Sequence, residues 1–277
     1  MGIKIVKPTS PGRRSATFDD FSDITKTEPE KTLIVIKKGQ AGRNNTGKIT
    51  VRHQGGGVKR YIRQIDWLRN KFDIPGRIMS VEYDPNRGAR IGLVNYKDGA
   101  KRYIILPIGL KVGDEIMSSK NQIEIKIGNA MPIKFIPPGV EVYNIELELG
   151  RGGKIARAAG NLVFVMGVEG NYAQIKMPSG EIRRINKECL CTVGQVSNPD
   201  YRHITIGRAG RQRLLGIRPT VRGTAMNPVD HPHGGGEGNQ PIGLKHPKTK
   251  WGKPALGVKT RRAKKRSNRL IISRRKK

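Results

Sequence analysis

The chain of 277 residues carries 54 lysines and arginines against 22 aspartates and glutamates, which gives a formal net charge of +32. So basic a chain would repel itself unless a partner neutralised it, and this points to nucleic acid or to an anionic membrane surface. A membrane is disfavoured because the chain has no apolar run of about 18 residues, and because its basic C-terminal stretch lacks the leucine and aromatic face of an interfacial helix.

The net charge is uneven along the chain, at +12 for residues 1–120, +1 for 121–200 and +19 for 201–277. The middle third therefore has the composition of an ordinary globular domain, and the flanks carry the binding charge. The first residues mix Pro, Gly and Arg with polar side chains, which predicts neither a core element nor a secretory signal. We predict four parts: an N-terminal arm at 1–35, an OB-like RNA-binding barrel at 36–125, an SH3-like barrel at 126–200 and an extended basic C-terminal segment at 201–277.

Short segments with a period of two follow the arm and predict strands, separated by Gly, Pro or Asn residues. Lys97-Asp98-Gly99 predicts a type I′ hairpin turn, because Asp-Gly readily supplies the positive φ angles that this turn needs. The predicted strands of the first barrel are residues 33–36, 47–52, 59–65, 77–83, 90–96, 101–106 and 122–127.

A second set of strands is predicted at 140–149, 162–168, 172–177, 181–185 and 190–193, with tight turns at 169–171 and 178–180. Short strands at this spacing fit two small all-β barrels, one of a size for an OB-like barrel and one for an SH3-like barrel, although periodicity alone names neither topology. Cys189 and Cys191 lie one residue apart in a predicted strand. We expect them to be reduced core residues, as in a cytosolic protein.

The C-terminal segment has no acidic residue after Glu237 and holds ten cations within 261–277. Its Gly, Pro and His-rich part, residues 218–238, cannot form a core of its own, and a block of like charge is expected to be disordered when free. We therefore expect a polyanion to order this segment, and nucleic acid is the favoured partner.

Three glycine loops flanked by cations, 39–47, 52–60 and 150–154, are candidate RNA contacts. Glycine lets a backbone approach a phosphate closely, while Arg and Lys donate charge-assisted hydrogen bonds to phosphate oxygens. The alternative is that these glycines only make turns. Aromatic residues make up 5% of the chain, so we expect phosphate and shape recognition of folded RNA rather than base stacking.

Arg87 and Arg157 are the strongest candidates on the barrels, because each lies in a turn-like segment from which its side chain is expected to reach outwards. The alternative for each is a solvated surface arginine. The candidate RNA-binding residues are Arg13, Arg14, Arg43, Arg52, His53, Lys59, Arg60, Arg87, Arg151, Lys154, Arg157, Arg218, Arg222, His231, His233, Lys253, Arg261, Arg262, Lys264, Lys265 and Arg266.

His231 and His233, with Asp230 and Glu237 nearby, allow an alternative interpretation as a metal-dependent or acid–base enzyme. A closed zinc site would need further ligands that no nearby Cys or His supplies, and no nucleophile motif accompanies the pair. We therefore expect no catalytic residue and no metal ligand here. The histidines are interpreted as polar, stackable groups in a loop buried in RNA.

Several longer motifs carry a more specific resemblance, among them Gly216-Ile-Arg-Pro-Thr-Val-Arg-Gly223. Together they resemble the universal L2 (uL2) family of large-subunit ribosomal proteins, in its bacterial or organellar form, from one end of the chain to the other. Lys250 and residues 240–245 depart from the family's pattern and leave the local path of that loop open. The other motifs are residues 7–14, 42–45, 83–87, 152–153 with 158–160, and 225–238.

The resemblance implies an OB-fold domain followed by an SH3-like barrel, with terminal segments that thread into 23S-type rRNA. It implies a non-enzymatic, primary rRNA-binding protein that supports subunit association, tRNA binding and the peptidyl transferase region. Its expected partners are neighbouring ribosomal proteins and the small subunit, in a cytoplasmic, bacterial ribosome. No cofactor is expected beyond Mg²⁺ associated with the rRNA.

The resemblance also bears on the histidines, because Asp230-His231-Pro232-His233 matches the family loop that runs towards the peptidyl transferase region. His231 matches a histidine once proposed to take part in catalysis. The family acts within a machine whose catalyst is RNA, so we expect His231 to hold RNA geometry instead.

Overall fold

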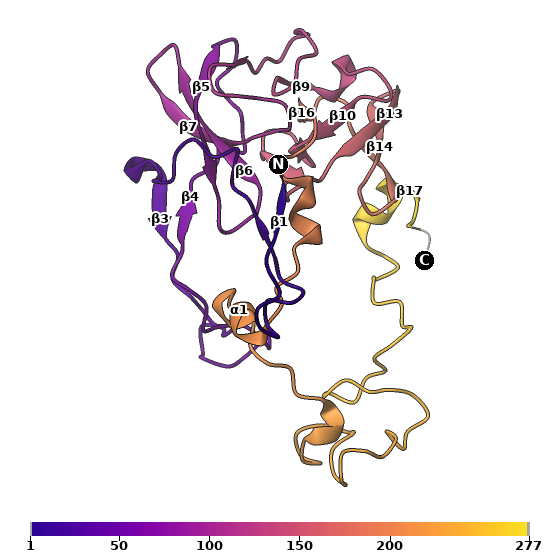
Figure 1. The fold of residues 1–277 in the computed structure, drawn as a ribbon. Helices are drawn as coiled ribbons and strands as arrows, with labels where there is room; N and C mark the ends of the chain where they lie inside the picture. The colour runs from indigo at the N-terminus through magenta and orange to yellow at the C-terminus, as the bar shows by residue number, and fades with distance from the viewer. Residues whose placement is uncertain (1, 276–277) are drawn as a thin grey trace. The chain divides into compact units, whose positions relative to one another are not determined.

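The computed structural model describes residues 2–275, and β-strands make up most of its regular structure (Figure 1). Internal contacts divide the chain into two compact units. The β unit comprises Met1–Lys38, Lys59–Arg208 and Arg269–Lys277, and the loop unit comprises Gly39–Val58 and Ala209–Asn268. Among the described residues, no helix is long and apolar enough to cross a membrane.

The first barrel of the β unit is built on an antiparallel sheet with the order β7-β6-β5-β8. Both faces of this sheet are buried: Ile91 and Tyr103 face one hydrophobic cluster, and Val94 and Ile104 face another. Burial on both faces explains the continuous apolar run at residues 91–94, in an inner strand of the sheet. The strands are β5 (Gly76–Tyr83), β6 (Arg90–Tyr96), β7 (Lys101–Ile105) and β8 (Glu115–Ile116), with β3 (Ile34–Ile36) paired to β4 (Tyr61–Arg63).

The second barrel is built on a curled sheet with the order β17-β15-β14-β13-β10-β16-β9. A register shift between Val165 and Gly167 marks a bulge in β13, which increases the local twist and helps the sheet to curl. The strands are β9 (Ala130–Pro132), β10 (Glu141–Tyr143), β13 (Val163–Glu169), β14 (Tyr172–Lys176), β15 (Ile182–Asn186), β16 (Leu190–Val193) and β17 (Ile271–Ser273), with β11 (Ile145–Glu146) paired to β12 (Gly153–Ile155). The fold is all-β, an OB-type barrel followed by an SH3-like barrel, as predicted.

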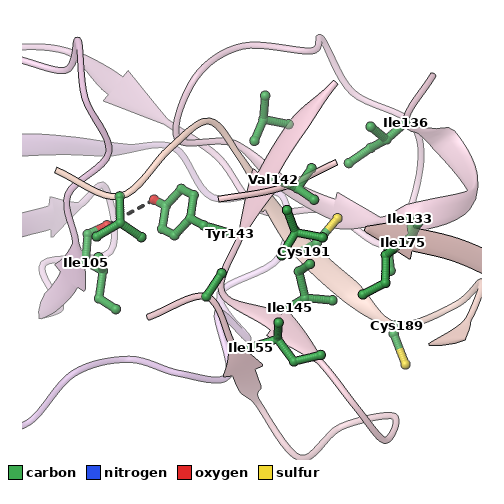
Figure 2. Packing of buried hydrophobic residues seen from close by; sticks show 14 of the residues in the cluster. Ile105, Ile133, Ile136, Val142, Tyr143, Ile145, Ile155, Ile175, Cys189 and Cys191 are labelled. Carbon is green, nitrogen blue, oxygen red and sulfur yellow. Dashed lines mark hydrogen bonds between the residues drawn. The ribbon is translucent and has the colours of Figure 1, made fainter. Parts of the chain in front are cut away.

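One hydrophobic core joins the two barrels (Figure 2). Tyr143 in β10 is buried and donates its hydroxyl hydrogen to the Ile105 carbonyl at the end of β7, at 3.0 Å. Cys189 and Cys191 lie in the same core as free thiols. Burial, with a smaller contribution from Glu146, raises the pKa of the Cys189 thiol to about 12. Both cysteines are core residues as predicted, although Cys189 precedes β16 rather than lying within it.

The remaining elements are short. β1 (Ile3–Ile5) pairs with β2 (Thr17–Asp19), and α1 (Ala209–Leu214) is the one α-helix among the described residues. The 3₁₀ helices are Lys31–Leu33, Ile133–Phe135, Pro199–His203, Gly223–Ala225 and Arg266–Leu270.

Arg90 at the start of β6 fastens the N-terminal segment to the first barrel. Its side chain is fully buried. The guanidinium donates hydrogen bonds to the carboxylate of Asp19 and to that of Asp23, at 2.6–3.1 Å. The Asn198 side chain donates to the same Asp19 carboxylate at 3.0 Å, and the Phe21 ring lies 5.3 Å from the guanidinium. Asp19 and Asp23 are half-buried rather than core residues, but the composition of the first residues did not predict that they would hold this segment on the barrel.

The C-terminal end also differs from the sequence prediction. Residues Ile271–Ser273 form β17 and pair with β15, with Ile182 opposite Ser273 and Arg183 opposite Ile271. Two isoleucines inside an otherwise basic stretch supply the β-propensity for this strand. The expectation that this basic stretch is disordered when free is therefore corrected at Ile271–Ser273, which add a strand to the second barrel.

Among residues 2–275, no strand forms at 47–52 or at 122–127, although the sequence predicted one at each place. In the first, the Gly42 carbonyl accepts the amides of Thr50 and Val51 and folds the segment back on itself. In the second, the Asn129 side chain donates to the Glu124 carbonyl and takes the place of a strand partner. Both segments use local hydrogen bonds that periodicity does not reveal.

Two further details of the predicted strands are wrong. Of residues 97–99, all of them described, only Gly99 takes a positive φ (+81°). A type I′ turn needs two such residues, so this hairpin uses another turn type. The predicted strand 140–149 is broken at Asn144, whose φ of +49° separates β10 from β11.

Candidate nucleic-acid interface

The loop unit brings together two distant glycine-rich stretches. Residues 53–58 run beside 214–218: the Gly55 amide donates to the Gly216 carbonyl at 2.9 Å, and the Arg218 amide donates to the His53 carbonyl at 3.1 Å. A side chain at Gly57 would approach the Gly216 backbone to 2.8 Å, so this glycine is required for packing. Gly55 and Gly57 therefore have a structural role in the loop unit. This agrees with the alternative to RNA contact given for the loop glycines.

The same pairing creates a hollow of about 380 Å³, which we call the arginine hollow. Three predicted cations, Arg43, Arg52 and Arg218, line it, and Val51 and Val221 contribute apolar wall. Its other lining residues are Ala41, Ile49, His53, Gln54, Gly55, Gly56, Pro219 and Met226. Four predicted site residues, counting His53, therefore meet in one place although they lie in two parts of the sequence.

Arg87 and Arg157, 70 positions apart in the sequence, meet at Trp67 in the β unit. Their guanidinium carbons lie 5.0 and 4.3 Å from the Trp67 ring centroid. Arg87 also pairs with the buried Asp84, and Arg157 donates to the Gly153 carbonyl at 3.1 Å. Burial, followed by the nearby charge of Arg87, lowers the pKa of Arg157.

These contacts correct the expectation that Arg87 and Arg157 reach freely outwards. Both are half-buried, and their planes are held against an aromatic surface. Sequence reasoning missed Trp67, although it is one of only two tryptophans in the chain. The rarity of tryptophan in this chain could have marked Trp67 as a candidate site residue. The residues next to it in the sequence did not indicate its two arginine partners.

His231 and His233 form a compact local structure in the loop unit. Their rings lie 4.7 Å apart, and His231 Nδ1 accepts a hydrogen bond from the His233 amide at 3.0 Å. His233 Nε2 accepts one from the Lys248 amide at 2.9 Å. A ring nitrogen that accepts an N–H bond is unprotonated, and this arrangement therefore favours a neutral His231.

The surroundings of His231 favour the same charge state. Burial, followed by the neighbouring His233 and the charge of Arg52, lowers the pKa of His231. A side chain at Gly223 would approach the His231 ring to 2.6 Å, so the ring packs directly on this glycine. The histidines therefore shape residues 223–248 rather than presenting two free bases.

A metal site needs several His, Cys, Asp or Glu ligands close together, and the structure describes residues 2–275. Within that range the carboxylates of Asp19, Asp20 and Asp23 come within 4.8 Å of one another, and two of them bind Arg90. No comparable group in that range contains His231 or His233.

The cations of the C-terminal tail surround a second hollow, of about 600 Å³, lined by Thr260, Arg261, Arg262, Lys264 and Lys265. The Arg261 guanidinium donates to the side chains of Asn268 at 2.6 Å and Ser267 at 2.9 Å. These contacts fold residues 261–268 into a turn and hold like charges close together. Such an arrangement suits a polyanionic partner.

The other predicted site residues are spread over both units. In the β unit, Arg60 donates to the Pro85 carbonyl at 3.0 Å and so supports the 84–88 turn, and the exposed Arg151 pairs with Glu148. The exposed residues are Arg13, Arg14, Lys59 and Lys154 in the β unit and Arg222, Lys253 and Arg266 in the loop unit.

Comparison with known families gives this arrangement a context. A family model described as the RNA-binding N-terminal domain of Ribosomal Proteins L2 matches residues 30–118. A second model, described as the C-terminal domain of Ribosomal Proteins L2, matches residues 126–252. Together they cover most of the chain, including both barrels and the histidine loop. The chain therefore belongs to the ribosomal protein L2 family, and its role is that of a structural, RNA-binding component of the large ribosomal subunit.

Proposed function

We propose that this protein is a primary binder of 23S-type rRNA, with the β unit docking on folded RNA and the loop unit ordered by RNA phosphates. The observation that carries the proposal is the composition of the loop unit. It holds seventeen lysines and arginines but only two acidic residues, Asp230 and Glu237. The cations of the unit therefore outnumber its carboxylates by fifteen.

The loop unit also lacks the usual means of ordering itself. Both hydrophobic clusters found among the described residues belong to the β unit. A segment with high charge and little apolar burial gains too little on folding to offset its conformational entropy. Phosphates supply the missing interaction energy, because each Arg or Lys contact releases condensed counterions.

The expected result is tight, strongly salt-dependent binding of the purified chain to large-subunit rRNA. A protein with about 6–10 phosphate contacts loses about 10³- to 10⁵-fold in affinity between 50 and 200 mM salt. Filter binding across that range measures the slope, with small-subunit rRNA of similar length as the control. Affinity that stays flat across the salt range, or that is equal for the two RNAs, would contradict the proposal.

We further propose that the protein supports subunit association, tRNA binding and the peptidyl transferase region, in contact with neighbouring ribosomal proteins and the small subunit of a cytoplasmic, bacterial ribosome. Membership of the family supports this assignment. The hydrogen bonds that His231 and His233 accept from backbone amides support a positioning role without enzymatic activity. Any Mg²⁺ near the basic tail would be bound by rRNA rather than by a protein site.

Replacing both His231 and His233 with alanine is expected to reduce assembly of the large subunit, because two backbone amides lose their acceptors. Particles that do assemble should retain peptidyl transfer within about threefold, since no proton transfer is assigned to these rings. The measurement is single-turnover peptide transfer on purified particles, normalised to particle number. Normal assembly with a loss of about 100-fold or more would instead indicate a catalytic base.

A further inference from the structure

The arginine hollow combines two properties that phosphate binding alone does not need. It has three arginines, which suit an anion, and it has apolar walls from Ile49, Val51 and Val221. These three side chains are 52–55% exposed, so no core residue covers them. Aliphatic side chains left open between arginines indicate a ligand with both an apolar face and a negative charge.

The volume of the hollow limits which part of a nucleic acid can enter it. At about 380 Å³ it falls at the lower end of the range for small-ligand pockets, about 300–1,000 Å³. A nucleic-acid duplex is too wide to enter it and would touch only the rim cations. A single unpaired base has an apolar face to pack on the walls, and its own phosphate can meet the arginines.

Contacts between the two glycine-rich stretches fix the backbone around the hollow in the folded loop unit. Ala41 and His53 both line it in the left-handed region, with φ of +48° and +64°, where residues other than glycine are uncommon. The Gln54–Ile217 bridge and the Arg218 amide hold the two sides together. Such strain is retained where the surrounding structure fixes it, and it is found most often at ligand sites.

We propose that the arginine hollow is a nucleotide pocket that receives one unpaired base of the rRNA, with Arg43, Arg52 and Arg218 contacting the flanking phosphates. This inference rests on the rRNA binding proposed above and specifies the RNA structure that the site selects. It adds a base-reading element to a protein whose low aromatic content had suggested phosphate and shape recognition only. The packing surface is aliphatic rather than aromatic.

The test fills the hollow without changing the charge. Val51→Trp and Val221→Trp place an indole at two different walls, and Val58→Trp is the matched control, because Val58 is 58% exposed in the same unit but does not line the hollow. The full-length chain is bound to large-subunit rRNA over a range of salt. The complex is also irradiated with short-wave ultraviolet light, and the peptides cross-linked to bases are mapped by mass spectrometry.

We expect each hollow-filling variant to bind about tenfold or more weakly, since the base loses its apolar burial against the walls. The slope of log affinity against log salt should stay unchanged, because no phosphate contact is removed. The wild-type chain should give a base cross-link within 49–56 or 218–226, and Val51→Trp should lose it. Val58→Trp should retain both the affinity and the cross-link.

Two results would overturn the pocket while leaving rRNA binding intact. In one, both filled variants bind like Val58→Trp. In the other, they lower the salt slope by about one, as expected for loss of a phosphate contact alone. A wild-type chain that fails to prefer large-subunit rRNA would overturn the proposed function as well. Using two separate walls guards against local misfolding in one variant, and circular dichroism checks each.

Discussion

Replacing Arg90 with leucine is expected to lower the free energy of unfolding by about 3–5 kcal/mol, because it leaves the carboxylates of Asp19 and Asp23 without their buried cation. Arg90 is fully buried, and Asp19 is only 8% exposed at its side chain, so water replaces the lost hydrogen bonds poorly. The measurement is equilibrium unfolding in urea followed by circular dichroism. N-terminal residues 17–23 should become accessible to protease at the same time.

Two matched variants separate the charge from its geometry. Arg90→Lys keeps the charge but cannot donate to two carboxylates in the forked geometry of a guanidinium, so an intermediate loss is expected. Arg77→Leu on the neighbouring strand removes an exposed arginine that donates only to the Gly113 carbonyl, and should cost less than about 1 kcal/mol. Equal losses for Arg90→Leu and Arg77→Leu would contradict the assigned role of Arg90.

The Arg90 contribution should also depend on pH. Burial raises the pKa of Asp19, but hydrogen bonds from Arg90 and the Phe21 amide, with the charge of Arg90, outweigh burial and hold this pKa below its usual value of 3.8. Stability from a lowered carboxyl pKa is present above the unfolded-state value and is lost as the pH falls through the folded-state value. The difference between wild type and Arg90→Leu should therefore shrink below about pH 4.

Arg90 illustrates where sequence reasoning stops. The strand itself was predicted with its correct bounds, 90–96, because turn signals flank an apolar run. The burial of its first residue could not be predicted, since a cation at a strand end usually faces solvent. Its partners Asp19 and Asp23 lie 71 and 67 residues away, in a segment whose composition resembles a linker.

The candidate site was likewise predicted only in part from the sequence. The sequence identifies its cations and glycines by type, and it identifies the histidine pair because that pair is local. It does not distinguish a glycine that approaches a phosphate from one, such as Gly57, that packs against Gly216. The meeting of Arg87 and Arg157 at Trp67 also depends on three separate segments of the fold, so only the tertiary structure reveals it.

Neutralising the five tail cations is expected to cause the largest loss of RNA affinity. In this variant glutamine replaces Arg261, Arg262, Lys264, Lys265 and Arg266. If each contacts one phosphate, the slope of log affinity against log salt should fall by about 4–5. The advantage of the wild type over the variant should then shrink about 500-fold between 50 and 200 mM salt.

Substitution separates charge from docking better than deletion does. Removing residues 261–277 would also remove β17 and its pairing with β15, so any loss of binding could follow from a disturbed second barrel. The glutamine variant retains β17, and its urea unfolding midpoint should match that of the wild type. A lower midpoint would show that the tail cations stabilise the fold itself.

The loss of RNA affinity could follow from the position of the tail cations or from the lower net charge of the protein. An equal charge change on the barrels distinguishes the two. The control replaces five exposed lysines with glutamine: Lys97, Lys101, Lys111, Lys126 and Lys176. If the tail forms the phosphate contacts, this control should change the salt slope by less than about 1. Equal slopes for the two variants would mean that long-range attraction to the whole protein dominates. Because that attraction is screened beyond about 10 Å at 0.1 M salt, we expect the tail variant to be the weaker binder at physiological salt.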